Sequence, residues 1–146
     1  MHELSIAASI FDAVLVEAEK NNAKAVKEIN VDVGELMQLD VKALSESLSL
    51  LIKGSKLETA QIFLHVKEAS FSCRKCGTSW DMRAARNELE KIQDDLLIRE
   101  PDSKELPLHF LPSLYSAFIH CPKCGSSEAE MSEGSEDVRL RKIVME

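Results

Sequence analysis

The chain has 146 residues, of which 45% are hydrophobic, and a formal net charge of −7. That length and apolar content are enough for one ordinary domain with a core and a smaller module beside it. The acidic balance argues against nucleic acid as a partner, because nucleic-acid binding rests on Lys and Arg that neutralise phosphates. The sequence has no apolar run of membrane-spanning length, and its start, Met-His-Glu-Leu-Ser-Ile, lacks the basic segment and cleavage site of a secretory signal. We therefore expect a cytoplasmic protein that makes no membrane contact.

Two helices and two strands are predicted before the first cysteine. Apolar residues recur three and four positions apart over residues 3–21, which is the spacing of one helical face. Alternating apolar residues predict a strand over 27–35. The next helix should begin after Asp40, a good N-cap residue, and stop at Gly54. Alternation returns over 60–71 and predicts a strand that leads into the first cysteine motif.

All four cysteines lie in two short motifs, Cys73-x-x-Cys76-Gly and Cys121-x-x-Cys124-Gly. Such a turn brings two sulfurs within about 4 Å of each other, and the glycine accepts the left-handed backbone that follows. Four thiolates assembled in this way predict a tetrahedral metal site with zinc as its occupant. The cytoplasm keeps thiols reduced, which favours a metal over the alternatives of two disulfides or two redox-active dithiols.

A long insertion, residues 78–119, separates the two motifs, whereas compact zinc ribbons separate them by about one or two dozen residues. Asp81 is placed to cap a helix in this insertion. The apolar positions of that helix are Met82, Ala85, Leu89, Ile92 and Leu96. Prolines punctuate the rest, so residues 106–112 should be extended. After the second motif we expect an acidic loop over 126–137 and a last strand over 138–145.

The order of these elements predicts an α/β fold. Two helices should pack on a small three-stranded sheet, beside a zinc-ribbon-like module that holds the four cysteines and carries the long insertion. We expect an α/β domain over residues 1–70 that binds metal, a zinc-binding module over 71–128, and a C-terminal strand within 129–146 that returns to the first domain.

The first three residues, Met1, His2 and Glu3, fall outside the apolar pattern of the first helix and form a candidate metal site. A free terminal amine and an imidazole on the next residue can hold one cation together with the backbone amide between them. Ni(II) and Cu(II) favour the square-planar, nitrogen-rich geometry that results. The bulk of His2 should prevent removal of Met1. A histidine in the second position also occurs without any metal role, because chain ends are usually unstructured.

Met1-His2-Glu3-Leu4-Ser5, the Gly34-Glu35-Leu36 turn and the two cysteine motifs together resemble the HypA/HybF family over almost the whole chain. Members of this family are nickel metallochaperones of hydrogenase maturation, and the family's fold agrees with the predicted order of elements. The resemblance implies a nickel site at Met1, His2 and Glu3, and a structural zinc held by Cys73, Cys76, Cys121 and Cys124. The long insertion is similar to that of archaeal members. The partners implied are the nickel-handling GTPase of the same pathway and the precursor of the NiFe hydrogenase large subunit.

The remaining histidines differ in their expected roles. The terminal amine, the His2 amide and the His2 imidazole fill three corners of a square plane, so nickel needs a fourth donor. His109, which the prolines of the insertion stiffen, is one candidate, as the similar histidine-bearing stretch of archaeal members suggests, and Glu3 is the other. His120, beside the second cysteine motif, should lie near the zinc without binding it, because four thiolates complete the site. His65 should be an exposed strand residue.

Two other functions fit parts of the sequence. The cysteine motifs also resemble the iron site of rubredoxin, an electron carrier, and they suit a zinc-ribbon module that binds a protein or a nucleic acid. An enzyme is not expected, because the sequence has neither a nucleophile paired with a base nor a glycine-rich phosphate loop.

Overall fold

The computed structural model describes residues 2–89, 98–100, 103–105 and 119–146 of the protein. The chain forms two compact units, neither of which is a continuous stretch of sequence. The first, here called the α/β unit, consists of Met1–Asp32, Leu39–His65 and Val138–Glu146. The second, the cysteine unit, consists of Val33–Gln38 and Val66–Asp137.

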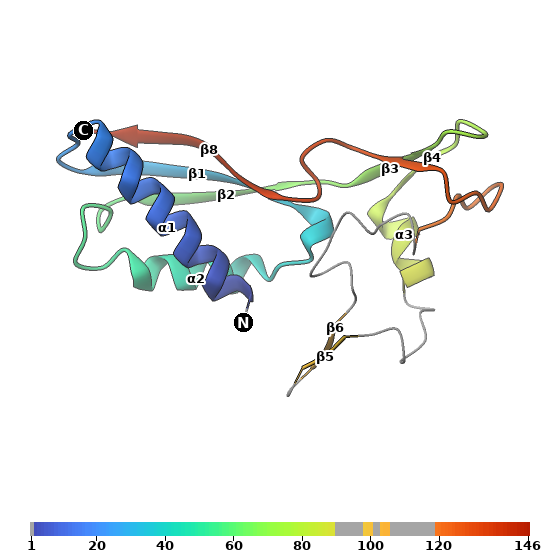
Figure 1. Ribbon diagram of the computed structural model, residues 1–146, viewed down its shortest axis with the longest axis horizontal. Helices are drawn as coiled ribbons and strands as arrows, with labels where there is room; N and C mark the ends of the chain where they lie inside the picture. Colours follow the sequence, from blue (N-terminus) through green and yellow to red (C-terminus); the bar gives the residue numbers. More distant parts are fainter. Residues whose placement is uncertain (1, 90–97, 101–102, 106–118) are drawn as a thin grey trace. The chain divides into compact units, whose positions relative to one another are not determined.

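The α/β unit contains two helices and a three-stranded sheet (Figure 1). The helices are α1, His2–Lys20, and α2, Val41–Leu51. The sheet has the order β2, β1, β8, in which β2 is Gln61–Lys67, β1 is Val26–Gly34 and β8 is Val138–Met145. Helix α1 packs along α2 and contacts β8. The predicted arrangement of two helices on a small three-stranded sheet is confirmed.

Both helices form for the reasons that the sequence indicates. The inner face of α1 is a stripe of buried residues spaced three and four apart: Ala7, Ile10, Val14 and Ala18. Asp40 caps α2, since its carboxylate Oδ1 accepts the backbone N–H of Ala43 at 3.0 Å. Just beyond α2, Gly54 has a φ of +77°. None of the helices that the structure describes is long and apolar enough to span a membrane.

β1 and β8 run antiparallel, as their hydrogen bonds at opposite ends show. The N–H of Glu146 donates to the carbonyl of Ala25 at 2.9 Å, and the N–H of Gly34 donates to the carbonyl of Asp137 at 2.8 Å. As residue numbers rise along one strand they fall along the other, which is the signature of an antiparallel pair.

The two faces of this sheet differ in polarity. Ile29, Val31 and Val33 of β1 are buried, whereas the alternate residues Asn30 and Asp32 point to the other face. There Asp32 forms an ion pair of 2.7 Å with Arg141 of β8, and Asn30 Oδ1 lies 3.1 Å from His65 Nε2 of β2. His65 therefore lies on the polar face, but it is half-buried and hydrogen-bonded, so its predicted exposure was wrong. A cross-strand partner, invisible in the local alternation, explains the difference.

The cysteine unit is built on a second three-stranded sheet, with the order β4, β3, β7. β3 is Ser70–Cys73, β4 is Ser79–Asp81 and β7 is Ala129–Met131, and β3 is antiparallel to both neighbours. Phe71 of β3 stacks on Trp80 of β4, with ring centroids 5.7 Å apart. Other buried residues of this core are Leu36, Ala69, Met82, Ala85, Ile119 and Ala129.

Two predictions of secondary structure were wrong in this region. The strand expected over 60–71 is two strands, because β2 ends at Lys67 and β3 begins at Ser70. Between the two strands the backbone N–H of Ala69 donates to the carboxylate of Glu35 at 3.0 Å. The loop expected over 126–137 contains β7, which long-range pairing with β3 creates from an acidic, weakly strand-forming sequence.

The structure describes only part of the predicted insertion. Helix α3, Met82–Leu89, begins where expected, since Asp81 Oδ1 accepts the N–H of Ala84 at 3.0 Å. β5, Ile98–Glu100, and β6, Ser103–Glu105, form a separate antiparallel pair. The helical positions Ile92 and Leu96 and the extended segment 106–112 lie outside the described residues.

Glycine is needed at position 34 because the backbone of Ser135 lies close to it, and not because of its backbone angles. Its φ of −67° suits any residue. A Cβ at this position would lie 2.4 Å from the carbonyl oxygen of Ser135. The N–H of Leu36 donates to that same oxygen at 2.9 Å, so the loop before β8 is held against the Gly34-Glu35-Leu36 turn. Only glycine leaves room for this contact.

Candidate metal centre

The two cysteine motifs fold into equivalent knuckles. In the first, the N–H of Gly77 donates to the carbonyl of Cys73 at 2.9 Å, and in the second Gly125 donates to Cys121 at 2.9 Å. The two glycines have φ of +77° and +73°, a left-handed conformation that other residues adopt at a cost. The predicted role of these glycines is thus confirmed in both turns.

Backbone N–H groups in the second knuckle point at sulfur. The N–H groups of Lys123 and Cys124 lie 3.4 and 3.5 Å from Cys121 Sγ. N–H donors favour the thiolate over the thiol, because they stabilise the negative charge. This part of the chain therefore prepares Cys121 to act as a metal ligand.

The four sulfurs lie at distances that suit one tetrahedral metal ion. Cys73 Sγ is 3.6 Å from Cys124 Sγ, and Cys76 Sγ is 3.5 Å from Cys121 Sγ. All four ligand atoms lie within 4.8 Å of one another. A zinc ion with bonds of about 2.3 Å to four thiolates places the sulfurs about 3.8 Å apart, so the donor set fits zinc. The same separations are far longer than the S–S bond of about 2.0 Å, and all four cysteines are free.

Without a cation the pKa values of Cys76, Cys121 and Cys124 are shifted in different directions. Hydrogen bonds from the side chain and backbone of Thr78 lower the pKa of Cys76 to about 6. Burial would raise the pKa of Cys121, but the N–H groups of Cys124 and Lys123 outweigh it and lower that pKa. The N–H of Ser126 favours the thiolate of Cys124, yet local desolvation of the sulfur and the neighbouring thiols raise its pKa to about 11. A dication among the sulfurs would stabilise all four thiolates and so outweigh the influences that disfavour ionisation.

Each knuckle buries its first cysteine and exposes its second. Cys73 and Cys121 are buried, and Cys76 and Cys124 are exposed. In the part of the chain that the structure describes, the cluster of potential ligands contains these four cysteines and no histidine. The side chain of His120 is exposed. Its predicted place close to the metal stays a prediction.

The N-terminal site is described only in part. Met1 and the side chain of His2 lie outside the described residues, and so does His109. The carboxylate of Glu3 accepts the N–H of Asp40 at 3.1 Å. Burial would raise the pKa of Glu3, but this hydrogen bond helps to lower it below its ordinary value. No sequence pattern indicates this link, since it joins residues far apart in the chain.

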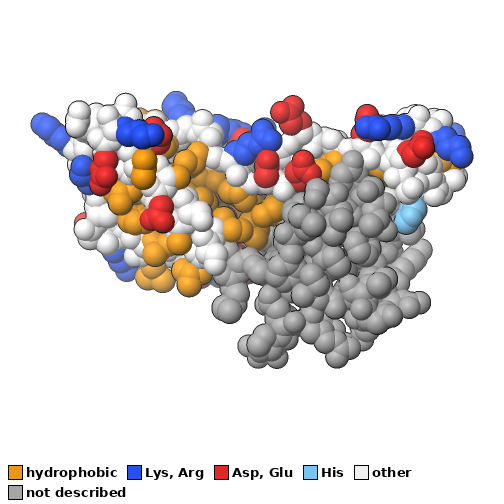
Figure 2. Space-filling model, in the orientation of Figure 1, with side chains coloured by type: hydrophobic (Ala, Val, Ile, Leu, Met, Phe, Trp, Pro, Cys, Tyr) orange, Lys and Arg blue, Asp and Glu red, His pale blue; other side chains and the backbone are white. Residues whose placement is uncertain are grey.

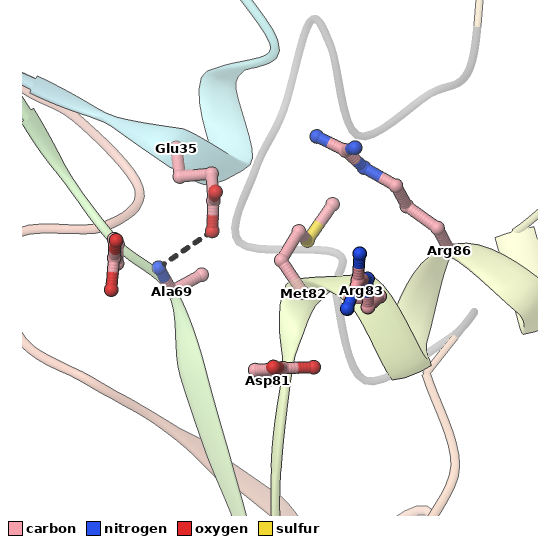
Figure 3. Close-up of a pocket in the computed structure, with 7 residues that line it drawn as sticks. Glu35, Ala69, Asp81, Met82, Arg83 and Arg86 are labelled. Carbon is pink, nitrogen blue, oxygen red and sulfur yellow. Dashed lines mark hydrogen bonds between the residues drawn. The ribbon is translucent and has the colours of Figure 1, made fainter.

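A second cleft, also missed by the sequence analysis, lies within the cysteine unit and encloses about 210 Å³ (Figure 3). Its wall combines carboxylates and guanidinium groups around the buried side chain of Met82. The lining residues are Glu35, Glu68, Ala69, Asp81, Met82, Arg83 and Arg86. Glu35 is held by its hydrogen bond to Ala69, which the close-up shows. Its described lining has no thiol or imidazole, so this cleft is chemically distinct from the metal centre.

Comparisons with known proteins agree with these features. A family model described as "HypA: Hydrogenase/urease nickel incorporation, metallochaperone, hypA" matches residues 1–145. The hydrogenase maturation factor HypA of Pyrococcus horikoshii is 36% identical over 135 residues, which are 92% of this chain and 88% of that protein. HypA of Ignicoccus hospitalis is 32% identical over 141 residues, covering 94% and 92% of the two chains.

A solved structure shows the same fold. The solution structure of the Ni metallochaperone HypA from Helicobacter pylori matches with a TM-score of 0.54 and 17% identity, over 98% of this chain and 96% of that one. The family match confirms the resemblance seen in the sequence and the prediction of a protein that handles metal rather than an enzyme. The chain belongs to the HypA family of metallochaperones for nickel incorporation into hydrogenase and urease.

Proposed function

We propose that this protein binds Ni(II) at its N-terminus and delivers it for the maturation of NiFe hydrogenase, while zinc at the four cysteines serves a structural role. The observation that carries the proposal is the match to a nickel-incorporation family over residues 1–145, a span that includes Met1, His2 and Glu3. Nickel is cargo here, so its site must both load and release the ion.

The chemistry of the N-terminus supports nickel. The Met1 amine, the backbone amide of His2 and the His2 imidazole are three nitrogen donors in adjacent positions. Nitrogen-rich square-planar coordination is what Ni(II) prefers. One carboxylate oxygen of Glu3 is engaged by the N–H of Asp40. This favours the Glu3 backbone amide or His109 over the Glu3 carboxylate as fourth donor.

The cysteine centre supports a structural zinc. Cys73, Cys76, Cys121 and Cys124 would hold the ion, and a closed set of four thiolates leaves no position for a substrate. When bound, zinc would supply a cross-link between two knuckles that the long insertion separates in sequence. The chain's own contribution is the pair of glycine turns and the N–H groups that stabilise the thiolates.

The family supports a general statement about partners, and we add a more specific proposal. A role in hydrogenase maturation implies partners in that process. We propose that these are the nickel-handling GTPase and the precursor of the hydrogenase large subunit, that the transfer takes place in the cytoplasm, and that residues 1–70 with the returning C-terminal strand carry the nickel. An electron carrier is less well supported, because the matched family is described by nickel incorporation.

Nickel titration of untagged protein tests the proposal. Protein whose intact N-terminus is verified by mass should compete with a chelator for one Ni(II). A peptide tag before Met1, or His2→Ala, should abolish binding and leave the zinc content unchanged. His120→Ala is the matched control, since it removes an exposed imidazole elsewhere. Undiminished nickel affinity in the tagged protein would refute the N-terminal site.

A further inference from the structure

Two sulfur contacts of the cysteine cluster run between the knuckles, inside the cysteine unit. Cys76 Sγ lies 3.5 Å from Cys121 Sγ, and Cys124 Sγ lies 3.6 Å from Cys73 Sγ. In each pair one cysteine is exposed, Cys76 or Cys124, and its neighbour is buried. A sulfur that a dissolved oxidant can reach is thus in contact with a protected sulfur that is 45 or 51 residues away in the sequence.

This arrangement suits the formation of disulfides by a peroxide. Such an oxidant is attacked by a thiolate that solvent can reach, and the resulting sulfenic acid is then attacked by a second thiolate. A second sulfur in contact makes that step intramolecular, so it competes well with further oxidation of the first. An S–S bond is about 2.0 Å long, so each pair must close by only about 1.5 Å.

We propose that hydrogen peroxide oxidises the cluster to two disulfides across the knuckles, one between Cys76 and Cys121 and one between Cys124 and Cys73. In each pair the exposed thiolate attacks a peroxide oxygen, the O–O bond breaks and hydroxide leaves. The buried thiolate then attacks the sulfenic sulfur, the S–O bond breaks and a second hydroxide leaves. Each disulfide therefore takes two electrons from its thiolates and reduces one peroxide to two hydroxides.

Oxidation would empty a zinc site at these residues. The sulfurs of a disulfide are neutral and no longer stabilise a dication as thiolates do. The sequence has four cysteines, so two disulfides leave no thiolate in the cluster. The pairing of the sulfurs rests on their geometry alone, whereas the release of zinc rests on the zinc site proposed above.

The cross-knuckle pairing also determines what happens to the fold. Disulfides within each motif would leave the two knuckles unconnected. Disulfides between them join the segments before and after the insertion, which is the connection that zinc would otherwise supply. We therefore expect the oxidised unit to stay folded without zinc, and dithiothreitol to restore the four thiols.

Tryptic mapping reads the pairing directly, because basic residues separate the cysteines of each motif. Arg74 and Lys75 lie within the first motif, and Lys123 lies within the second. Trypsin therefore distributes the four cysteines over four peptides, 68–74, 76–83, 105–123 and 124–139. The zinc-loaded full chain is treated with hydrogen peroxide and its free thiols are blocked before digestion. Mass spectrometry should find 68–74 linked to 124–139, and 76–83 linked to 105–123.

The same oxidation in urea is the matched control. In an unfolded chain the shortest loops close most readily, so disulfides within each motif should dominate there. Cys121→Ser gives a second measurement. Cys76 should then stop at the sulfenic acid, which dimedone traps, while Cys124 still pairs with Cys73. Pairing within the motifs would instead leave Cys124 as the trapped residue, and the map of the unaltered chain decides the matter if this variant does not fold.

Zinc content and tryptophan emission test the consequences. Trp80, the one tryptophan of the sequence, stacks on Phe71 in the core of the cysteine unit. Oxidation should lower the zinc content from about one ion per chain to near zero, with one zinc released for every two peroxides consumed. The emission of Trp80 should stay unchanged. Removal of zinc from the reduced protein by a chelator should shift that emission to longer wavelength, because the core opens.

The outcomes separate this proposal from that of a structural zinc. Disulfides within the motifs of the folded chain, four free thiols after excess peroxide, or a red-shifted emission after oxidation would each overturn the proposal made here. Protein that holds no zinc before oxidation and still forms the cross-knuckle disulfides would refute the zinc site and support the pairing.

Discussion

The carboxylate of Glu3, in the first turn of α1, accepts the backbone N–H of Asp40, the N-cap residue of α2, at 3.1 Å. The N–H groups at the start of a helix have no partner within it, and a carboxylate beside them is favoured by the helix dipole. Asp40 uses its own side chain on Ala43. The starts of the two helices are thus tied together next to the proposed nickel site.

Glu3→Gln should make the protein slightly less stable at neutral pH. The folded pKa of Glu3 lies below its unfolded value, so its ionised form stabilises the fold above a pH of about 4.3, and this contribution disappears as the pH falls through the folded pKa. Because the group is largely solvated, the effect should be about 0.5 kcal/mol. Urea unfolding of both proteins should show a difference at pH 7 that vanishes near pH 3. A difference that persists at low pH would contradict the assignment.

Loss of one zinc ligand should unfold the cysteine unit and spare the α/β helices. Cys73→Ala removes a buried sulfur from the cluster, and three remaining thiolates cannot close the site. Zinc content should fall from about one ion per chain to near zero, with faster proteolysis of the cysteine unit. Ser72→Ala, one residue earlier in β3, is the control. Retained zinc with unchanged protease resistance in Cys73→Ala would count against a structural zinc.

Nickel affinity should fall as the pH is lowered from 8 to 6. The terminal amine and His2 must both be unprotonated to bind, and their reference pKa values are about 7.7–8.0 and about 6.5. Competition by protons should therefore weaken binding by roughly a hundredfold over these two pH units, most of it between pH 7 and pH 6. Isothermal titration at several pH values, in buffers of different ionisation enthalpy, would also count the protons released. An affinity independent of pH would rule out these two ligands.

His109→Ala should weaken nickel binding at least about tenfold if this histidine is the fourth donor, since loss of one ligand opens the square plane. The comparison needs untagged protein, with and without the GTPase partner, in competition with a chelator. His120→Ala serves again as the control. Affinity equal to the parent protein in both conditions would eliminate His109 and leave Glu3.

Gly34→Ala should destabilise the protein by about 3 kcal/mol, because the added methyl would meet the backbone of Ser135 at 2.4 Å and no flexible side chain can yield. Gly54→Ala is the contrasting variant. Its φ of +77° makes alanine unfavourable, but no atom lies within 4 Å of the added group, so the cost should be only about 1 kcal/mol. Thermal or urea unfolding measures both. Similar costs for the two variants would mean that the Ser135 loop moves aside.

The sequence predicts best what depends on local spacing. The cysteine knuckles and the cap at Asp40 need only a few neighbouring residues, and both were correctly located. The family resemblance was also correct, because short motifs carry it. Local patterns say nothing about distant partners, which is why the Glu3 link to Asp40 and the strand Ala129–Met131 were missed.

The same limit explains the strand that was predicted as one and is two. The apolar alternation of Ile62, Leu64 and Val66 ends at Glu68, and there Glu35, distant in sequence, accepts the N–H of Ala69 between the two strands. His65 illustrates the point for a side chain, since its partner Asn30 lies on another strand. Such contacts decide boundaries and burial without leaving a periodic signal.

The position of β8 in the chain has a consequence for synthesis on the ribosome. β1 emerges early, but its antiparallel neighbour β8, residues 138–145, follows both cysteine knuckles. The sheet beneath α1 and α2 therefore stays incomplete until the knuckles have been translated and are free to fold. A nascent chain cannot finish the domain that begins with Met1 before it has made all four thiols, so the cysteine motifs are able to fold before the N-terminal domain is complete.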